Sequence, residues 1–158
     1  MINIDDYVIK QDGKDWYALL EGWLPLLPRV FGVWVVNRLG DVILVSEDRT
    51  IHFFEVGCAQ IQCIAIDQEE FYAKLVQDEN ALYWLAIPQV DACVAAGKLL
   101  EVGQCYGFTV PPMLGGRYEV ENLEPTDLAV HYALLADIWQ QIKDLPEGTV
   151  IESVQLSE

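Results

Sequence analysis

The chain has 158 residues, of which 53% are hydrophobic and 11% aromatic; this composition excludes a disordered protein and is sufficient for a buried core. Its 25 acidic and nine basic residues give a formal net charge of −16, shared equally at −8 each between residues 1–79 and 80–158. Direct binding of nucleic acid is therefore disfavoured, because phosphates require clustered Lys and Arg. No apolar run reaches the roughly 18 residues of a membrane helix, and the acidic N-terminus lacks the apolar core of a signal peptide. We expect one cytoplasmic domain over residues 1–158, with no membrane partner.

The first half of the chain predicts a helix followed by a run of strands. KDWYALLEGWLP (14–25) has apolar residues at i, i+3, i+4 and i+7, which predicts a helix capped by Asp12 and ended by Pro25. Residues 31–67 are rich in β-branched and aromatic residues and contain turn signals at 37–40, 47–50 and 57–60. These signals divide the segment into an antiparallel meander of about four strands. Because the strands are apolar at nearly every position, helices or loops are expected on both faces.

Further helices are predicted after the meander. Asp67 opens one that runs to about Gln77, with Glu70 in a capping-box position. Residues 79–97 predict one or two more, with a boundary or restart at Pro88.

The last helix is expected from Leu128 to Lys143, while residues 126–131 fit a strand as well as a helix. Its apolar stripe consists of Leu128, Leu135, Ile138 and Ile142. A turn at 146–148 then leads into a short tail. The resulting fold class is α+β, with a central antiparallel sheet of about four meander strands plus one or two later strands, flanked by helices.

Few residues suggest catalysis or metal binding. The four cysteines match no zinc spacing, and the glycines match no phosphate loop. Cys105, His131 and Asp127 could form a nucleophile–base–orienter set, because an aspartate four residues before a histidine on a helix can orient the imidazole. Any chain with four cysteines and two histidines offers such a combination, so structural roles are favoured. We therefore expect no catalytic, cofactor-binding or metal-ligating residues and no cofactor.

The stretch GQCYGFTVPPMLGGRYEVENL (103–123) combines a proline pair, a glycine pair, three aromatic residues and one arginine. The glycines favour a turn or close backbone approach and the prolines a stiff extended run, so a structural crossing packed by its aromatic residues is the simplest interpretation. The acidic residues that follow could bind a divalent metal only if their carboxylates converged, and strand alternation would place just Glu119 and Glu121 on one face. Our functional hypothesis is instead that a partner-binding rim is formed by Arg117, Glu119, Glu121 and Glu124.

Residues 103–151 resemble the C-terminal signature of a bacterial family, the immunity proteins of type VI secretion DNase effectors, described as GAD-like or SUKH-like. LEGWLPLLP (20–28) and VNRLGDVILV (36–45) are also similar to the family, so the resemblance covers about residues 14–151. Arg49 and Thr50 replace an aspartate that is frequent in the family after the second strand. The matching positions are Gly103, Gln104, Cys105, Tyr106, Phe108, Pro111, Pro112, Leu114, Gly115, Gly116, Tyr118, Glu121, Asn122, Asp127, Leu128, Val130, His131 and 143–146.

This resemblance implies a SUKH-like architecture and stoichiometric neutralisation of a cognate toxin, without turnover or cofactor. The acidic composition agrees, because a nuclease must be basic where it grips phosphates. The expected partner is accordingly a toxin with a basic surface. Two alternatives remain: a regulatory or structural interaction module with an unknown partner, and a small hydrolase that uses Cys105, His131 and Asp127.

Overall fold

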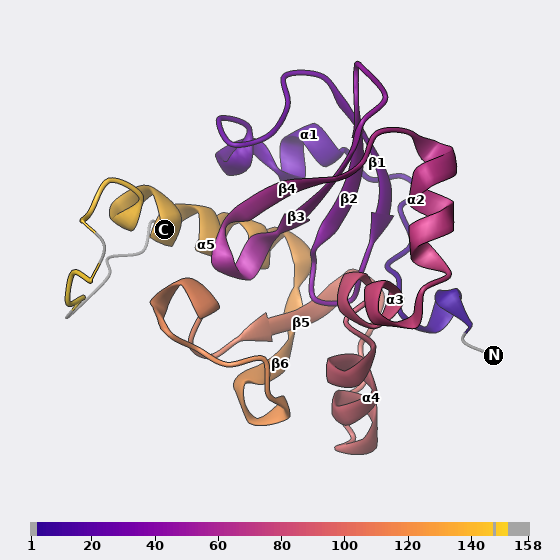
Figure 1. Ribbon diagram of the computed structural model, residues 1–158. Coiled ribbons are helices and arrows are strands. Elements are labelled where there is room, and N and C mark those ends of the chain that lie inside the picture. The colour runs from indigo at the N-terminus through magenta and orange to yellow at the C-terminus, as the bar shows by residue number, and fades with distance from the viewer. Residues whose placement is uncertain (1–2, 147, 152–158) are drawn as a thin grey trace.

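The protein is an α+β structure, seen in a computed structural model that describes residues 3–146 and 148–151 (Figure 1). A four-stranded antiparallel sheet in the order β1-β2-β3-β4 forms its centre, and β5 pairs with β6 in a separate two-stranded sheet. The strands are β1 (Phe31–Val36), β2 (Val42–Ser46), β3 (Ile51–Glu55), β4 (Gln60–Ala65), β5 (Gln104–Phe108) and β6 (Leu123–Asp127). The helices are α1 (Trp16–Leu19), α2 (Gln68–Leu75), α3 (Asp78–Trp84), α4 (Ile87–Ala95) and α5 (Leu128–Ile142). The predicted fold class and four-stranded meander are confirmed, with the two later strands forming their own sheet.

The turns of the meander fall where the sequence predicts them, and each contains a residue with a positive φ. These residues are Gly40 (φ 84°), Arg49 (φ 71°) and Ala59 (φ 54°). In the first turn the side-chain oxygen of Asn37 accepts hydrogen bonds from the amides of Leu39 (2.9 Å) and Asp41 (3.0 Å). Asparagine and glycine are the residues that such turns favour, and this is why local sequence locates the turn correctly.

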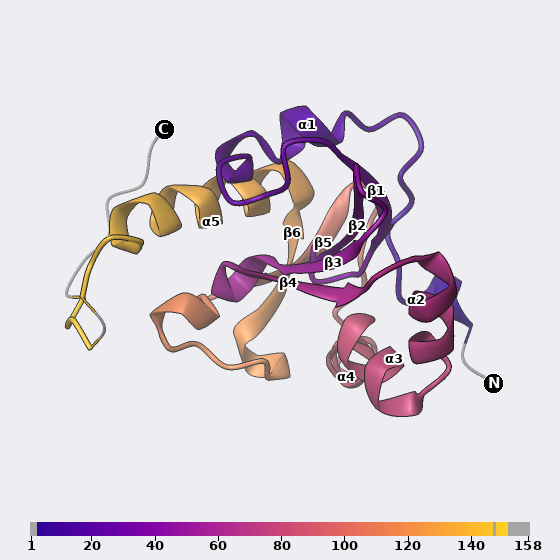
Figure 2. The ribbon, with the colours of Figure 1, turned by 45° about the horizontal axis from the view of Figure 1, so that its top comes forward.

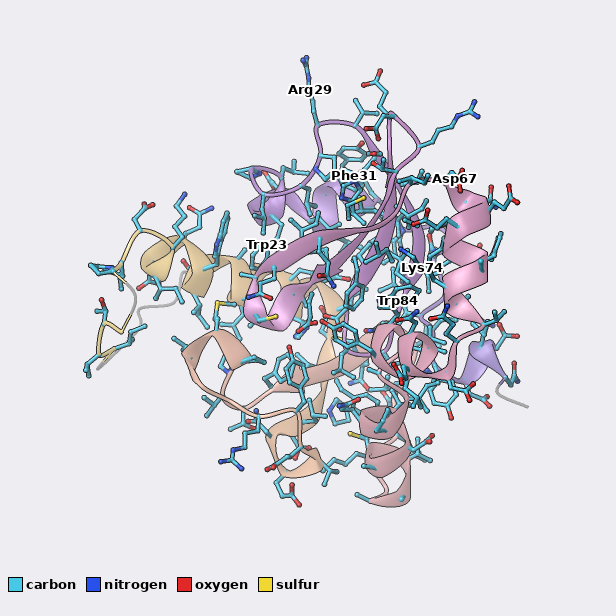
Figure 3. The ribbon with its side chains drawn as sticks, viewed as in Figure 1. Trp23, Arg29, Phe31, Asp67, Lys74 and Trp84 are labelled. Carbon is cyan, nitrogen blue, oxygen red and sulfur yellow. The ribbon has the colours of Figure 1, made fainter. Side chains whose placement is uncertain are left out.

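Both faces of the central sheet are covered, as its continuous apolar strands predict (Figure 2). Alternation in β2 directs Val42 and Leu44 toward α5 and the first helical segment, and Ile43 toward α2 and α3. Trp23, from the 3-10 turn Glu21–Trp23, and Trp84, from α3, belong to these two separate cores (Figure 3). A third apolar cluster joins α4 to the β5–β6 sheet.

The helix starts show how side-chain caps set the boundaries. Asp15, not the predicted Asp12, caps α1 by accepting from the amide of Ala18 at 3.1 Å. Asp67 caps α2 by accepting from the amide of Glu70 at 2.8 Å, as predicted. Between α3 and α4 the backbone breaks at Ala86 (φ 51°), which confirms a boundary in this region.

The ambiguous segment 126–131 contains both a strand end and a helix start. β6 ends at Asp127, whose carboxylate accepts from the amide of Val130 at 3.1 Å and begins α5. In the predicted stripe of α5, Ile142 is only partly buried and the other three residues are buried. The predicted turn at 146–148 includes Glu147, and the tail from residue 152 onward also lies outside the described residues.

Candidate functional site

The loop between β5 and β6 is held closed by one asparagine. Asn122 accepts from the amide of Val110 at 2.8 Å, and its Nδ2 donates to the carbonyls of Val110 and Arg117, both at 2.8 Å. Gly116 packs directly against the backbone of Val110, so that a Cβ at position 116 would be 1.6 Å from the Val110 carbonyl oxygen. Gly115 ends the short 3-10 turn Pro112–Leu114 with a φ of 93°. This loop, residues 109–122, is called the Asn122 loop below.

The aromatic residues of the 103–123 stretch anchor it to the core. Tyr106 is fully buried, and its hydroxyl donates to the carbonyl of Lys98 at 2.6 Å. Phe108 packs edge-to-face against Tyr118, with ring centroids 5.4 Å apart. Pro111 is buried, whereas Pro112 is partly exposed. The motif residues thus give the stretch a defined path across the molecule.

Cys105, His131 and Asp127 do not assemble into a catalytic set. Cys105 is fully buried, and burial raises the pKa of its thiol, so no thiolate nucleophile forms there. The Nε2 of His131 lies 3.0 Å from the carbonyl of Leu39, and burial lowers the pKa of this imidazole to about 4. Asp127 is exposed and caps α5 rather than orienting His131. The geometry therefore assigns structural contacts to all three.

The predicted partner-binding rim is exposed, but of its residues only Glu124 lies on a strand, β6. Glu119 precedes the 3-10 turn Val120–Asn122, which contains Glu121, so the strand alternation expected there is wrong. Arg117 is 79% exposed and lies 3.6 Å from the carboxylate of Glu119. Lys98 lies 2.7 Å from the carboxylate of Glu124. Two of the three glutamates on this rim therefore have a basic neighbour within the chain.

A second acidic site, which the sequence analysis missed, is centred on Glu55 at the end of β3. Glu55 as a whole is only 9% exposed. Its carboxylate accepts hydrogen bonds from Tyr118 (2.8 Å), from the Cys58 thiol (2.7 Å) and from the hydroxyl of Tyr83. Burial and the carboxylate of Glu55 raise the pKa of Cys58 to about 12 and raise the pKa of both tyrosines, so all three groups remain protonated donors near neutral pH. Glu55 thereby connects the central sheet to α3 and to the Asn122 loop.

Asp41 lies beside Glu55 and is buried from solvent. Its two oxygens accept from the amide of Val56 (3.0 Å) and from the Nδ2 of Asn37 (3.0 Å), which also donates to the carbonyl of Trp84. Burial raises the pKa of Asp41 to about 7; the hydrogen bonds from Asn37 and Val56 oppose this shift, while the charge of Glu55 adds to it. Ionisation of Asp41 beside Glu55 is therefore electrostatically unfavourable.

Glu55 and Tyr83 line two neighbouring hollows on the surface. The first, of about 300 Å³, also has Asp41, Glu79, Leu82 and Tyr118 in its wall. The second, of about 380 Å³, lies toward β4 and contains Leu26, Phe53 and Ile61. Among the described residues, no Lys or Arg lines either hollow. These two hollows together are called the Glu55 groove.

Two sequence signals could have located the groove. Glu55 in IHFFEVG and Asp41 in VNRLGDVILV are acidic residues at the ends of apolar strand runs, where a buried charge is rare unless it is hydrogen-bonded or paired. In the described part of the chain, the groove included, no group of three or more His, Cys, Asp or Glu side chains could hold a metal ion. The described helices include none that is long and apolar enough to cross a membrane.

The fold and these sites define an acidic α+β protein with a carboxylate-lined groove beside a closed loop. Residues 66–139 of this chain match the family described as T6SS immunity protein Tdi1, C-terminal, which confirms the resemblance to type VI secretion immunity proteins and supports an immunity role. The matched segment begins after β4 and ends within α5, so it includes Tyr83 and Tyr118 of the groove.

Comparison with other proteins adds one solved structure. Atu4351 from Agrobacterium tumefaciens is similar at a TM-score of 0.43 and 22% sequence identity, over 76% of this chain and 60% of that one. The chain thus spans about 60% of the length of that protein. No curated protein matches the chain. The SUKH-like architecture stays a prediction.

Proposed function

We propose that this protein is a cytoplasmic immunity protein that binds a cognate type VI secretion toxin and neutralises it by stoichiometric occlusion. The observation that carries this proposal is the match of residues 66–139 to the Tdi1 C-terminal family. In this proposal residues 1–158 act as one domain, without catalysis and without a cofactor. The family resemblance further suggests that the toxin is a nuclease that attacks DNA.

Charge supports binding to a basic toxin. A nuclease must present Lys and Arg where it holds phosphates, and a chain with a net charge of −16 complements such a surface. Complementary charge speeds association by steering the partners together, and it disfavours wrong partners. An immunity protein benefits from both effects, because it must capture the toxin before DNA does.

The exposed rim at the Asn122 loop is proposed as part of the contact surface. Glu121 is exposed and makes no ion pair with any described residue, so its charge is available to a basic partner. Arg117 reduces the negative potential around Glu119, and Lys98 does so at Glu124. We therefore expect the rim to affect the rate of association more than the strength of the final complex.

Co-expression with the toxin encoded beside this chain's gene tests the proposal. We expect growth rescue and co-purification of a 1:1 complex that weakens as salt rises, because exposed charge pairs are screened. A catalytically inactive toxin is the control for expression level. Rescue with salt-insensitive binding would retain the immunity role and remove the acidic contact surface. No rescue and no complex would favour the alternative, an interaction module with another partner.

A further inference from the structure

Among the described residues no Lys or Arg lines the Glu55 groove, whereas Lys14 and Arg49 each line another hollow of the surface. Lys74, Lys98 and Arg117 each lie within 4 Å of a glutamate elsewhere on the molecule, at Glu70 (2.8 Å), Glu124 (2.7 Å) and Glu119 (3.6 Å) respectively. In contrast, Asp41, Glu55 and Glu79 form no ion pair with any described residue. The groove therefore contains acidic side chains that have no basic neighbour within the described part of the chain.

Most hydrogen-bonding positions inside the groove are already occupied, which defines what a ligand could use. The Glu55 carboxylate accepts three hydrogen bonds, and a carboxylate offers about four lone-pair positions. Asp41 accepts two at the floor. Glu79, on the first turn of α3, is exposed at the mouth of the first hollow and is the most accessible of the three.

The walls of the groove include apolar and aromatic side chains. Tyr83 is 51% exposed and lines both hollows, and Leu82, which is next to it in the chain and lines the first hollow, is 40% exposed. An aromatic face attracts a cation, and a guanidinium stacks on it more readily than an ammonium does. A hollow of about 300 Å³ is at the lower limit for ligand pockets, a size that fits one long side chain.

We propose that the Glu55 groove binds a cationic side chain of the toxin, an arginine. Glu79 binds its guanidinium group, and Tyr83 stacks against that group. This inference rests on the proposed immunity function and names the surface and the partner chemistry. The exposed Leu82 contacts the aliphatic part of the inserted side chain. The acidic side chains of the groove have no basic neighbour among the described residues, and one buried, hydrogen-bonded cation of the partner supplies the opposite charge.

Two groove substitutions with matched controls test this inference. Glu79→Lys reverses the charge at the mouth, and Leu82→Arg places a cation of the chain's own in the hollow. Both positions are exposed in α3, so folding should be retained, and urea unfolding checks this directly. Glu47→Lys, in the exposed β2–β3 turn, and Val102→Arg, at a fully exposed position, repeat the same chemical changes away from the groove.

The readout is the Kd for the inactive toxin, measured by calorimetry with each variant. We expect both groove variants to bind at least about 30-fold more weakly, the loss typical of a central contact, and both controls to stay within about threefold of the wild type. A toxin Arg→Glu variant that restores binding to Glu79→Lys would identify the seated arginine. Groove variants that bind like the wild type, or controls that lose as much, would overturn the groove assignment alone. A wild-type chain that does not bind the toxin would overturn the proposed function, and the groove assignment with it.

Discussion

The Asn122 loop and the Glu55 groove meet at Tyr118, yet their polar groups are used differently. In the loop, Asn122 uses its side chain to satisfy backbone groups, and nearby carboxylates are exposed and mostly close to a base. In the groove, Glu55 and Asp41 are buried, hydrogen-bonded by neutral donors, and not paired with a base among the described residues.

This difference indicates which region is stabilised more by the charge of a binding partner. Exposed ion pairs contribute little, because water and salt already screen them. A buried carboxylate that lacks a counter-charge gains much more from a cation, because the local dielectric constant is low. The loop is therefore expected to determine stability, and the groove to determine the affinity for a partner.

Breaking the loop should have the largest effect on stability. Gly116→Ala places a Cβ against the Val110 carbonyl at 1.6 Å, and we expect the free energy of unfolding to fall by about 3 kcal/mol. Urea denaturation measures this difference. Gly115→Ala is the matched control: its added Cβ meets no atom within 4 Å, so the loss should be only the roughly 1 kcal/mol of a positive φ. Equal losses for the two variants would contradict the close approach at Gly116.

The pH dependence of stability should distinguish the groove from the rest of the core. The folded pKa of Asp41, about 7, exceeds its ordinary value of 3.8, so the stability that it contributes is complete below about pH 4 and is lost as the pH rises through 7. Asp41→Asn removes this term. Relative to the wild type, the variant should therefore gain up to about 1.4 kcal/mol of unfolding free energy per pH unit between pH 4 and 7.

His131 acts in the opposite direction over the same range. Its folded pKa of about 4 is below its ordinary value of 6.5, so its contribution is present above pH 6.5 and is lost as the pH falls through 4. In the wild type, Asp41 and His131 change the free energy of unfolding in opposite directions as the pH rises. In Asp41→Asn, only the contribution of His131 remains. Urea unfolding at half-unit pH steps measures both. A constant difference between wild type and Asp41→Asn would show that Asp41 does not titrate in this range.

Tyr118 connects the two regions and should show an intermediate effect. Tyr118→Phe removes one donor from the buried Glu55 carboxylate, and we expect a loss of about 1–2 kcal/mol in the free energy of unfolding. Tyr83→Phe removes another donor from the same carboxylate, but the half-exposed position admits water, so its cost should be smaller. The reverse order would indicate that Glu55 is held mainly from α3.

The smallest effect is expected at the rim. Glu121→Lys should change toxin affinity by less than about threefold at physiological salt and should act mainly on the association rate, as rim charges usually do. Stopped-flow association at two salt concentrations measures this. A loss as large as that of Glu79→Lys would move the centre of the contact from the groove to the Asn122 loop.

The fold was largely predictable because its signals are local. Turn residues such as Asn37 and Gly40, and the cap at Asp67, act within a few positions of the chain. The sequence can mark Glu55 and Asp41 as unusual, but it does not predict which side chains surround them, because Tyr83 and Tyr118 are 28 and 63 positions from Glu55. The expected strand at Glu119–Glu121 was wrong because Asn122 holds the backbone in a tight turn.

The central claim, stoichiometric neutralisation, is tested most directly by titrating the purified toxin with this protein while its nuclease activity is measured. At toxin concentrations far above the Kd, we predict that activity falls linearly and reaches zero at one protein chain per toxin, at a level independent of incubation time. Complete inactivation by a small fraction of an equivalent, increasing with time, would instead indicate catalysis. Full activity in the presence of excess protein would contradict the immunity role.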